Sequence, residues 1–132
     1  MITIGSHTSN IRRAVRKLVN FVVNNAPDAT VDDDDLAMVL SEALANAIIH
    51  GNRRNPRRKV VAQASIDRRK VVFKVVDEGK GFDHSNLPCP TDPENFRKTY
   101  GRGLFLIRQF MDRVVFNRSG NEMVMIKNLK VI

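Results

Sequence analysis

The segment Leu36–Ile49 is apolar at every position except Ser41, Glu42 and Asn46. Its apolar residues recur at helical spacing, which predicts a helix that packs against other parts of the chain over most of its surface. This helix must therefore lie inside the fold, and its two strongly polar side chains must face something other than open water. The chain has 132 residues, which is enough for one hydrophobic core, and we expect a single domain over residues 1–132.

Other patterned segments predict the elements around this helix. The aspartates Asp32–Asp35 stand where a helix start leaves backbone amides unpaired, so they indicate a helix beginning rather than a metal site, and this helix is expected to stop near Gly51. Apolar periodicity predicts further helices at Ile11–Val22 and Leu104–Met111, and strands at Met1–Ile4, Val60–Ile66, Lys70–Val76, Val114–Asn117 and Met123–Ile132. This order indicates an α+β fold, a two-layer α/β sandwich whose mostly antiparallel sheet carries the helices on one face.

The composition excludes several classes of protein. No apolar run is long enough to span a bilayer and no signal-peptide pattern is present, so we expect a cytoplasmic protein without a membrane partner. Cys89 is the only cysteine, which excludes an internal disulfide. The net charge of +8 comes largely from the clusters Arg12–Lys17, Arg53–Lys59 and Asp67–Lys70, which can bind phosphates, nucleic acid or an acidic protein. No helix-turn-helix or zinc pattern accompanies them, so direct nucleic-acid binding would rest on charge alone and is not expected.

The polar residues of the central helix form a candidate site. Glu42 and Asn46 are four residues apart, so they share one face of the helix, and His50 follows one turn later. They border the apolar stripe, and we expect them to face a cleft. The alternative is an exposed glutamate and a hydrogen-bonded asparagine, but the apolar neighbours Met38 and Ile49 leave little of this helix for water. A partly buried carboxylate without a partner costs free energy, which indicates a ligand or a chemical role for Glu42.

A second candidate element is VVDEGKGF, residues 75–82. An apolar strand ends at Asp77, and Gly79 and Gly81 let the backbone turn sharply and approach a ligand closely. Taken alone this pattern is weak, because plain turns often have the same composition.

The third element is YGRGLFLI, residues 100–107, in which Gly101 and Gly103 directly precede the predicted helix. The first amides of a helix are unpaired and lie at the positive end of its dipole, so they can bind phosphate. The stretch before it, from Asp77 to about Tyr100, has no periodicity, and a loop of that length in a compact domain is usually functional.

In their order and spacing the three elements resemble the GHKL superfamily of ATP-binding domains, which includes gyrase, heat-shock chaperone, histidine kinase and mismatch-repair ATPases. The closest likeness is to the small bacterial branch of anti-sigma-factor serine kinases. The segments similar to its N-box, G1 box and G2 box are SEALANAIIHGN, VVDEGKGFD and GRGLFLIRQFMDRV, and the likeness extends to the IRRAVRKLV helix and the terminal GNEMVMIKNL strand. The resemblance implies the Bergerat, or histidine-kinase-like ATPase, fold.

The resemblance also implies a role for each matching residue. Glu42 would be the general base that deprotonates the attacking hydroxyl, and Asn46 would ligate Mg²⁺. Asp77 would accept a hydrogen bond from the adenine amino group, while Gly79 and Gly81 would leave room for the base. The phosphates would be bound by Gly101, Arg102, Gly103 and Leu104, and residues Phe82 to Tyr100 would form a lid over the nucleotide. His50 could contact the nucleotide as well; the alternative is that it stands there because a histidine is favourable at the negative end of a helix.

The implied activity uses ATP and Mg²⁺ to phosphorylate a serine of an anti-anti-sigma (STAS-type) partner, in a homodimer that otherwise sequesters a sigma factor. Two features depart from the branch. Tyr100 stands where a small residue usually precedes the glycines, and no Thr or Ser lies between Asn121 and Lys127. They leave open a regulator that responds to ATP without phosphorylating its partner. A basic nucleic-acid binder that uses Arg53–Lys59 is the remaining alternative.

Overall fold

The computed structural model describes residues 1–79 and 99–131. Within this part of the chain the main sheet has five strands in the order β1-β3-β4-β6-β5, and every neighbouring pair is antiparallel. The strands predicted at Val60–Ile66 and Lys70–Val76 are confirmed and pair as an antiparallel hairpin, whose turn residues Arg68 and Arg69 have φ angles of 48° and 67°. The strands are β1 (Ile2–Gly5), β3 (Lys59–Asp67), β4 (Lys70–Val76), β5 (Arg113–Phe116) and β6 (Glu122–Asn128).

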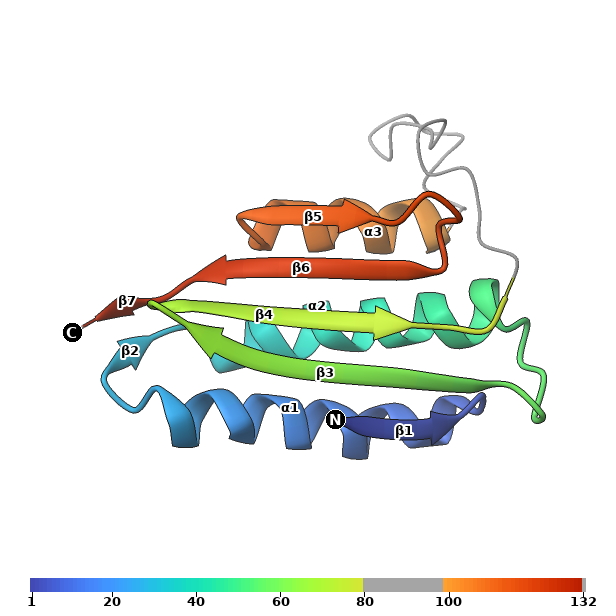
Figure 1. Cartoon of the computed structure of the whole chain (residues 1–132), viewed down its shortest axis with the longest axis horizontal. Helices are drawn as coiled ribbons and strands as arrows, with labels where there is room; N and C mark the ends of the chain where they lie inside the picture. Colours follow the sequence, from blue (N-terminus) through green and yellow to red (C-terminus); the bar gives the residue numbers. More distant parts are fainter. Residues whose placement is uncertain (80–98, 132) are drawn as a thin grey trace.

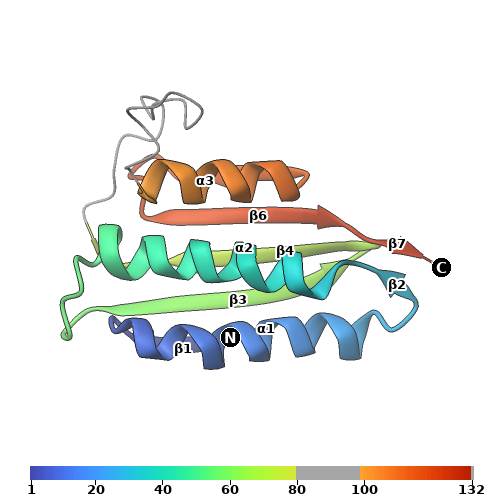
Figure 2. The same ribbon diagram turned by 180° about the vertical axis from the view of Figure 1, so that it is seen from behind.

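The helices lie on one face of this sheet (Figures 1 and 2). α2 lies between α1 and α3 and contacts both. This arrangement confirms the predicted two-layer α+β fold. The helices are η1 (Thr8–Asn10), α1 (Ile11–Asn25), α2 (Asp33–Ala45), its continuation as the wider π-helix η2 (Asn46–Gly51), and α3 (Thr99–Phe110).

α2 is the central helix because its apolar residues need a partner on nearly every side. Leu36, Leu40 and Leu44 are fully buried and belong to the same core as Phe73 of β4, which is also fully buried. Burying one such side chain contributes about 1.5–3 kcal/mol. This packing holds the last turns of α2 in one orientation, and those turns carry the candidate site.

The start of α2 follows the prediction made for the aspartate run. Oδ1 of Asp32 accepts hydrogen bonds from the backbone nitrogens of Asp34 and Asp35, both at 3.0 Å. The carboxylate thus caps the helix. Over residues 1–79 and 99–131, no group of three or more His, Cys, Asp or Glu side chains could hold a metal ion.

The prediction of one final strand over Met123–Ile132 is wrong. β6 ends at Asn128, and β7 (Lys130–Val131) pairs instead with β2 (Ala29–Thr30) in a separate two-stranded sheet. The sequence analysis did not predict β2, because a strand of two residues is too short for an alternating pattern to be recognised.

The predicted start of the third helix also differs. Gly101 and Gly103 lie within the first turns of α3, which begins at Thr99, instead of directly preceding it. Glycine has a low helix propensity, but propensity is a weak preference that packing overrides. Gly103 is buried and Leu104 is 2 % exposed, so this part of α3 is held against the rest of the protein.

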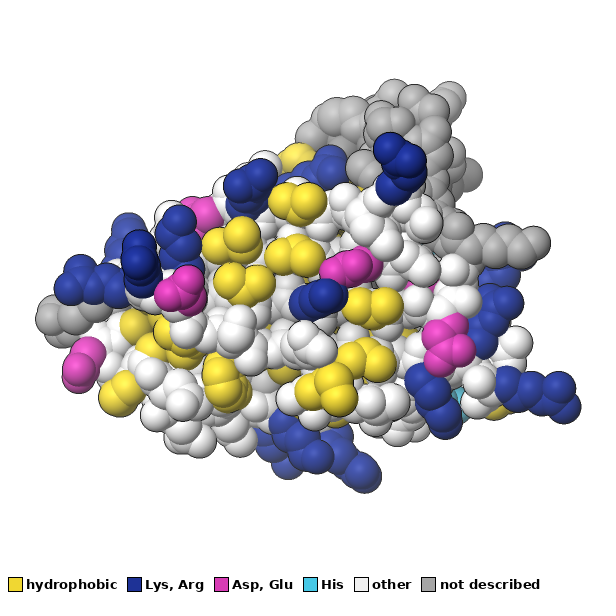
Figure 3. Space-filling view, in the orientation of Figure 1, with side chains coloured by type: hydrophobic (Ala, Val, Ile, Leu, Met, Phe, Trp, Pro, Cys, Tyr) yellow, Lys and Arg dark blue, Asp and Glu magenta, His cyan; other side chains and the backbone are white. Residues whose placement is uncertain are grey.

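The other face of the sheet carries aliphatic side chains among charged ones (Figure 3). Lys74 and Glu122 form an ion pair there, with 2.9 Å between Nζ and Oε1. The aliphatic positions that alternate with the buried ones on these strands are Val61, Val72, Val76, Val115, Val124 and Ile126.

No helix in the described part of the chain is long and apolar enough to cross a membrane.

Candidate functional site

The last turns of α2 bring the predicted acid and amide to the first turns of α3. Glu42 is partly buried, and Asn46, the first residue of η2, is 8 % exposed. Gly103 lies against both: a Cβ atom added to it would be 2.6 Å from Oε2 of Glu42 and 3.8 Å from Oδ1 of Asn46. The structure therefore brings Gly103 to Glu42 and Asn46, both of which lie 57 or more positions before it in the sequence. A side chain at position 103 would displace the carboxylate.

Asn46 holds an unpaired polar atom in a buried position. Its Nδ2 has no hydrogen-bond partner among the described residues. A buried donor left unpaired costs about 1–3 kcal/mol, which calls for an explanation. The amide nitrogen can donate to a phosphate oxygen while the carbonyl oxygen ligates Mg²⁺, a cation that takes few protein ligands beside phosphate and water. The donor set at Asn46 thus fits a magnesium-bound phosphate.

Asp77 ends β4 and is buried, with 9 % of its surface exposed. Its backbone nitrogen donates to the carbonyl oxygen of Asn121 at 2.9 Å, and its Oδ1 accepts from the nitrogen of Gly79 at 2.8 Å. Burial raises the pKa of the Asp77 carboxyl above its usual value, while the Gly79 amide and the Arg58 guanidinium act in the opposite direction. Only Oδ1 is hydrogen-bonded within the described residues, so Oδ2 can accept a donor from a ligand.

Two glycines let the turn at 77–79 pack directly on η2. A Cβ atom at Gly51 would overlap the Asp77 carboxylate, reaching Oδ1 at 2.7 Å, and a Cβ atom at Gly79 would overlap the carbonyl oxygen of Gly51. Sequence reasoning treated Gly51 only as a helix end and missed this contact. Its one signal was a glycine at the predicted end of the helix.

A small cavity lies between η2, β4 and the β5–β6 turn. Its volume is about 20 Å³, roughly the room that one water molecule needs. A purine ring can enter only if side chains of the wall move. The cavity is lined by Ala43, Asn46, Ala47, Gly51, Val75, Asp77, Phe116, Gly120, Asn121 and Met123.

The β5–β6 turn forms the wall that sequence reasoning missed. Oδ1 of Asn117 accepts hydrogen bonds from the nitrogens of Gly120, Asn121 and Glu122 at 2.8, 3.1 and 3.2 Å. Gly120 has a φ of 80°, a conformation that favours glycine. Residues 119–121 lie between two strands that the sequence predicts, but only the pairing of β6 with β4 places their turn beside Asp77.

The other predicted contacts are placed less centrally. His50 is exposed in the last turn of η2 and does not line the cavity; partial burial of its ring lowers its pKa, and the Arg54 guanidinium lowers it further. Arg102 is exposed near the start of α3, and the side chain of Leu104 belongs to the core. Gly101 lies in the first turn of the same helix.

Several predictions fall on residues 80–98, which lie outside the described part of the chain. These are the role of Gly81, the place of Cys89 and nearly all of the predicted lid from Phe82 to Tyr100.

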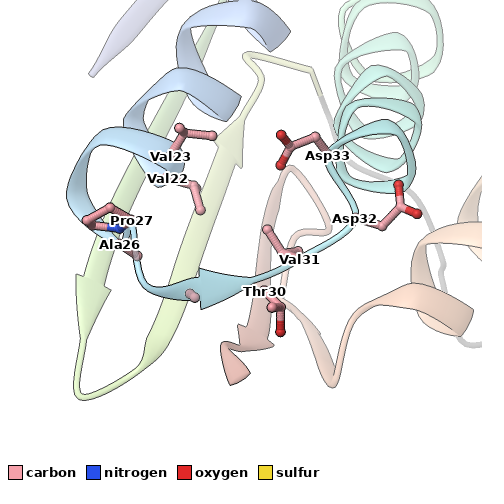
Figure 4. A pocket seen from close by; sticks show the side chains of 9 residues that line it. Val22, Val23, Ala26, Pro27, Thr30, Val31, Asp32 and Asp33 are labelled. Atoms are coloured by element: carbon pink, nitrogen blue, oxygen red, sulfur yellow. The ribbon is translucent and has the colours of Figure 1, made fainter. Parts of the chain in front are cut away.

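A wider hollow lies at the opposite end of the molecule, between the end of α1, β2 and the start of α2 (Figure 4). Its volume is about 600 Å³. Its walls include Val22, Val23 and Val31, and Asp32 and Asp33 stand at the start of α2. None of the residues predicted to bind nucleotide lines it, and the Asp32 carboxylate already caps the helix.

The chain is similar in sequence to several known proteins. The family model described as the histidine kinase-like ATPase domain matches residues 6–127. The chain is 33 % identical over 126 residues to the serine-protein kinase RsbW of Staphylococcus epidermidis, an alignment that covers 88 % of this chain and 78 % of that protein. It is 31 % identical over 112 residues to the anti-sigma F factor of Clostridium acetobutylicum, with 80 % and 77 % covered.

Solved structures show the same fold. The mycobacterial sensor histidine kinase MprB superimposes with a TM-score of 0.52 at 13 % identity, with 99 % of each chain covered. At this identity the likeness concerns the fold alone.

Proposed function

The chain belongs to the family of histidine kinase-like ATPase domains, and from this premise we propose that it binds ATP with Mg²⁺ and transfers the γ-phosphoryl group to a serine of a partner protein. The contact of Gly103 with Glu42 and Asn46 is the observation that carries the proposal. It puts a carboxylate, a buried amide and the start of a helix in one place, and phosphoryl transfer depends mainly on positioning and on stabilising charge.

Each group has a task in this reaction. Glu42 orients the attacking serine hydroxyl and accepts its proton. The first amides of α3, including that of Gly101, are unpaired within the helix and lie at its positive end, so they attract phosphate oxygens. Asn46 would hold Mg²⁺, which when bound would supply positive charge next to the phosphates.

The adenine ring is recognised at the other side of the cavity. Oδ2 of Asp77 accepts a hydrogen bond from the exocyclic amino group, and Gly79 and Gly81 leave room for the ring. The wall formed by Phe116, Gly120 and Met123 moves to admit the base, since the cavity is about 20 Å³. These assignments rest on the burial of Asp77 and on its Oδ2, which accepts no hydrogen bond from the described residues.

Calorimetric titration with ATP and Mg²⁺ tests the binding step. Wild type is expected to bind, and Asn46→Ala to lose the magnesium-dependent part of the affinity. Asn25→Ala is the control, because its amide donates to the Phe21 carbonyl at an exposed position of α1. Equal magnesium dependence in Asn46→Ala and wild type would refute the metal role.

Phosphate transfer is tested with purified STAS-type proteins as acceptors and ATP labelled in its γ-phosphate. Glu42→Gln is expected to lose transfer by about 10²-fold or more while ATP binding survives, as befits a positioned base. Glu122→Gln, which alters an ion pair on the other face of the sheet, is the control. If Glu42→Gln transfers phosphate as fast as wild type, the protein is instead the non-catalytic, ATP-responsive regulator.

The names of the relatives, a serine-protein kinase and an anti-sigma factor, support the choice of partners. We propose an anti-anti-sigma protein as the phosphoryl acceptor, a sigma factor as the sequestered partner, and a homodimer as the working unit. Light scattering coupled to size-exclusion chromatography measures the mass of the protein alone, which is expected to be twice the 14.9 kDa of one chain. A mass of one chain at micromolar concentration would refute the homodimer.

A further inference from the structure

Asn52 is a fully buried polar residue, 0 % exposed, that directly follows Gly51. Its Oδ1 accepts a hydrogen bond from the backbone nitrogen of Glu78 at 2.7 Å. Its Nδ2 donates to Oγ of Ser6 and to the carbonyl oxygen of Lys59, both at 2.9 Å. An asparagine amide that uses its oxygen and both its hydrogens is fully paired, and such a buried network holds one arrangement.

The network joins three segments that are distant in the sequence. Ser6 precedes η1, and its hydroxyl donates in turn to the carbonyl oxygen of Arg58 at 2.7 Å. Lys59 starts β3, and its nitrogen donates to Oε1 of Glu78 at 2.9 Å. Glu78 is the middle residue of the turn between Asp77 and Gly79, so two of these hydrogen bonds end on that turn.

The position of the Asp77 carboxylate depends on that turn. The backbone of Asp77 is held on one side by Asn121, and the Glu78 nitrogen bonded to Asn52 belongs to the peptide group that follows Asp77. Gly51 packs directly against the Asp77 carboxylate, and its neighbour Asn52 accepts a hydrogen bond from the backbone that follows Asp77. Without the Asn52 amide, the Asp77–Glu78 peptide loses one of the bonds that orient it.

We propose that Asn52 is a positioning residue for adenine recognition: it holds the 77–79 turn so that Oδ2 of Asp77 faces the amino group of the base. The inference rests on the proposed function, because it presupposes that the base binds beside Asp77. It goes beyond that proposal in assigning the selectivity for adenine to a residue that does not touch the nucleotide.

The test compares ATP with inosine triphosphate, whose base carries an oxygen in place of the amino group that Asp77 recognises. Calorimetry is expected to show that Asn52→Ala lowers the affinity for ATP by about tenfold, the value of one buried hydrogen bond, and changes the affinity for inosine triphosphate by less than about twofold. Ser6→Ala is the matched control, because Ser6 is a buried member of the same network that makes no bond to the turn. It is expected to lower stability and to keep the preference for ATP.

Two further measurements separate positioning from a general loss of structure. Amide hydrogen exchange of Glu78 and Gly79 in the protein without nucleotide is expected to accelerate in Asn52→Ala and to stay unchanged in Ser6→Ala. Asn52→Asp keeps an acceptor for the Glu78 nitrogen but loses the donor to the Lys59 carbonyl oxygen, so it is expected to lower stability while it keeps most of the preference for ATP. If Asn52→Ala does not fold, Asn52→Ser takes its place, since its hydroxyl is one bond too short to reach Glu78.

The outcomes distinguish the two proposals. Wild type that binds ATP no better than inosine triphosphate, or binds neither, would overturn the recognition of adenine by Asp77 and the inference with it. Wild type that prefers ATP, together with Asn52 variants that keep the same preference, would overturn only the role of Asn52.

Discussion

Replacing Asp77 with asparagine changes one atom of the candidate adenine site. The carboxylate oxygen that accepts from Gly79 at 2.8 Å has an equivalent in the asparagine carbonyl oxygen, so the turn can keep that bond. The other oxygen becomes an amide nitrogen, which donates and cannot accept. In the proposed complex, two donors would then face each other across the cavity.

The magnitude follows from one lost hydrogen bond to a charged acceptor. Such bonds contribute about 1.5–3 kcal/mol, so the affinity for ATP should fall roughly 10- to 150-fold. Stability should respond in the opposite direction. Burial raises the pKa of Asp77, which means that the folded protein disfavours its charged form, so a neutral residue of the same shape should leave the free energy of unfolding at pH 7 unchanged or higher.

Calorimetry with ATP and urea unfolding of the same samples measure the two effects separately. Glu78→Gln is the control, since it removes the charge of a neighbouring exposed carboxylate that accepts from the Lys59 nitrogen and does not line the cavity. Equal ATP affinity in Asp77→Asn and wild type would refute the placement of the adenine amino group. A large loss of stability at pH 7 would refute the argument from burial.

Three further outcomes are expected. Gly51→Ala should weaken ATP binding in a calorimetric titration by roughly 5- to 150-fold, since its Cβ would overlap the Asp77 carboxylate and overpacking costs about 1–3 kcal/mol. Gly5→Ala, whose Cβ would have no neighbour nearer than 3.6 Å, should bind ATP normally. ATP affinity should fall as the pH drops through the raised pKa of Asp77, whereas the stability that protonated Asp77 contributes is complete below its unfolded pKa and is lost as the pH rises through its folded pKa. Asp77→Asn should flatten both pH profiles, and unchanged profiles in this variant would count against Asp77 as the titrating group. Phe73→Ala should lower the free energy of unfolding, followed by urea denaturation, by about 3–5 kcal/mol, while Val115→Ala, 39 % exposed, should stay within about 0.5 kcal/mol; similar losses in both would contradict the assignment of the core.

The helix at Leu36–Ile49, the Lys70–Val76 strand and the fold class were determined by the sequence alone. The spacing of apolar residues indicates which face is buried, because side chains repeated at the period of a helix or strand all face the same layer. The location of Glu42 and Asn46 on one face was predictable for the same reason, as the two residues are four positions apart in one continuous helical segment.

Contacts between distant segments were decided only by the tertiary structure. Gly51 meets Asp77, Gly103 meets Glu42, and the Asn52 amide bonds to Glu78, although nothing local to these residues indicates the partner. The pairing of β6 with β4 brings the Gly120 turn to the cavity, and β2 pairs with β7 although Thr30 and Lys130 are 100 positions apart in the sequence. Such contacts follow from the packing of all layers at once, which a pattern confined to neighbouring residues does not contain.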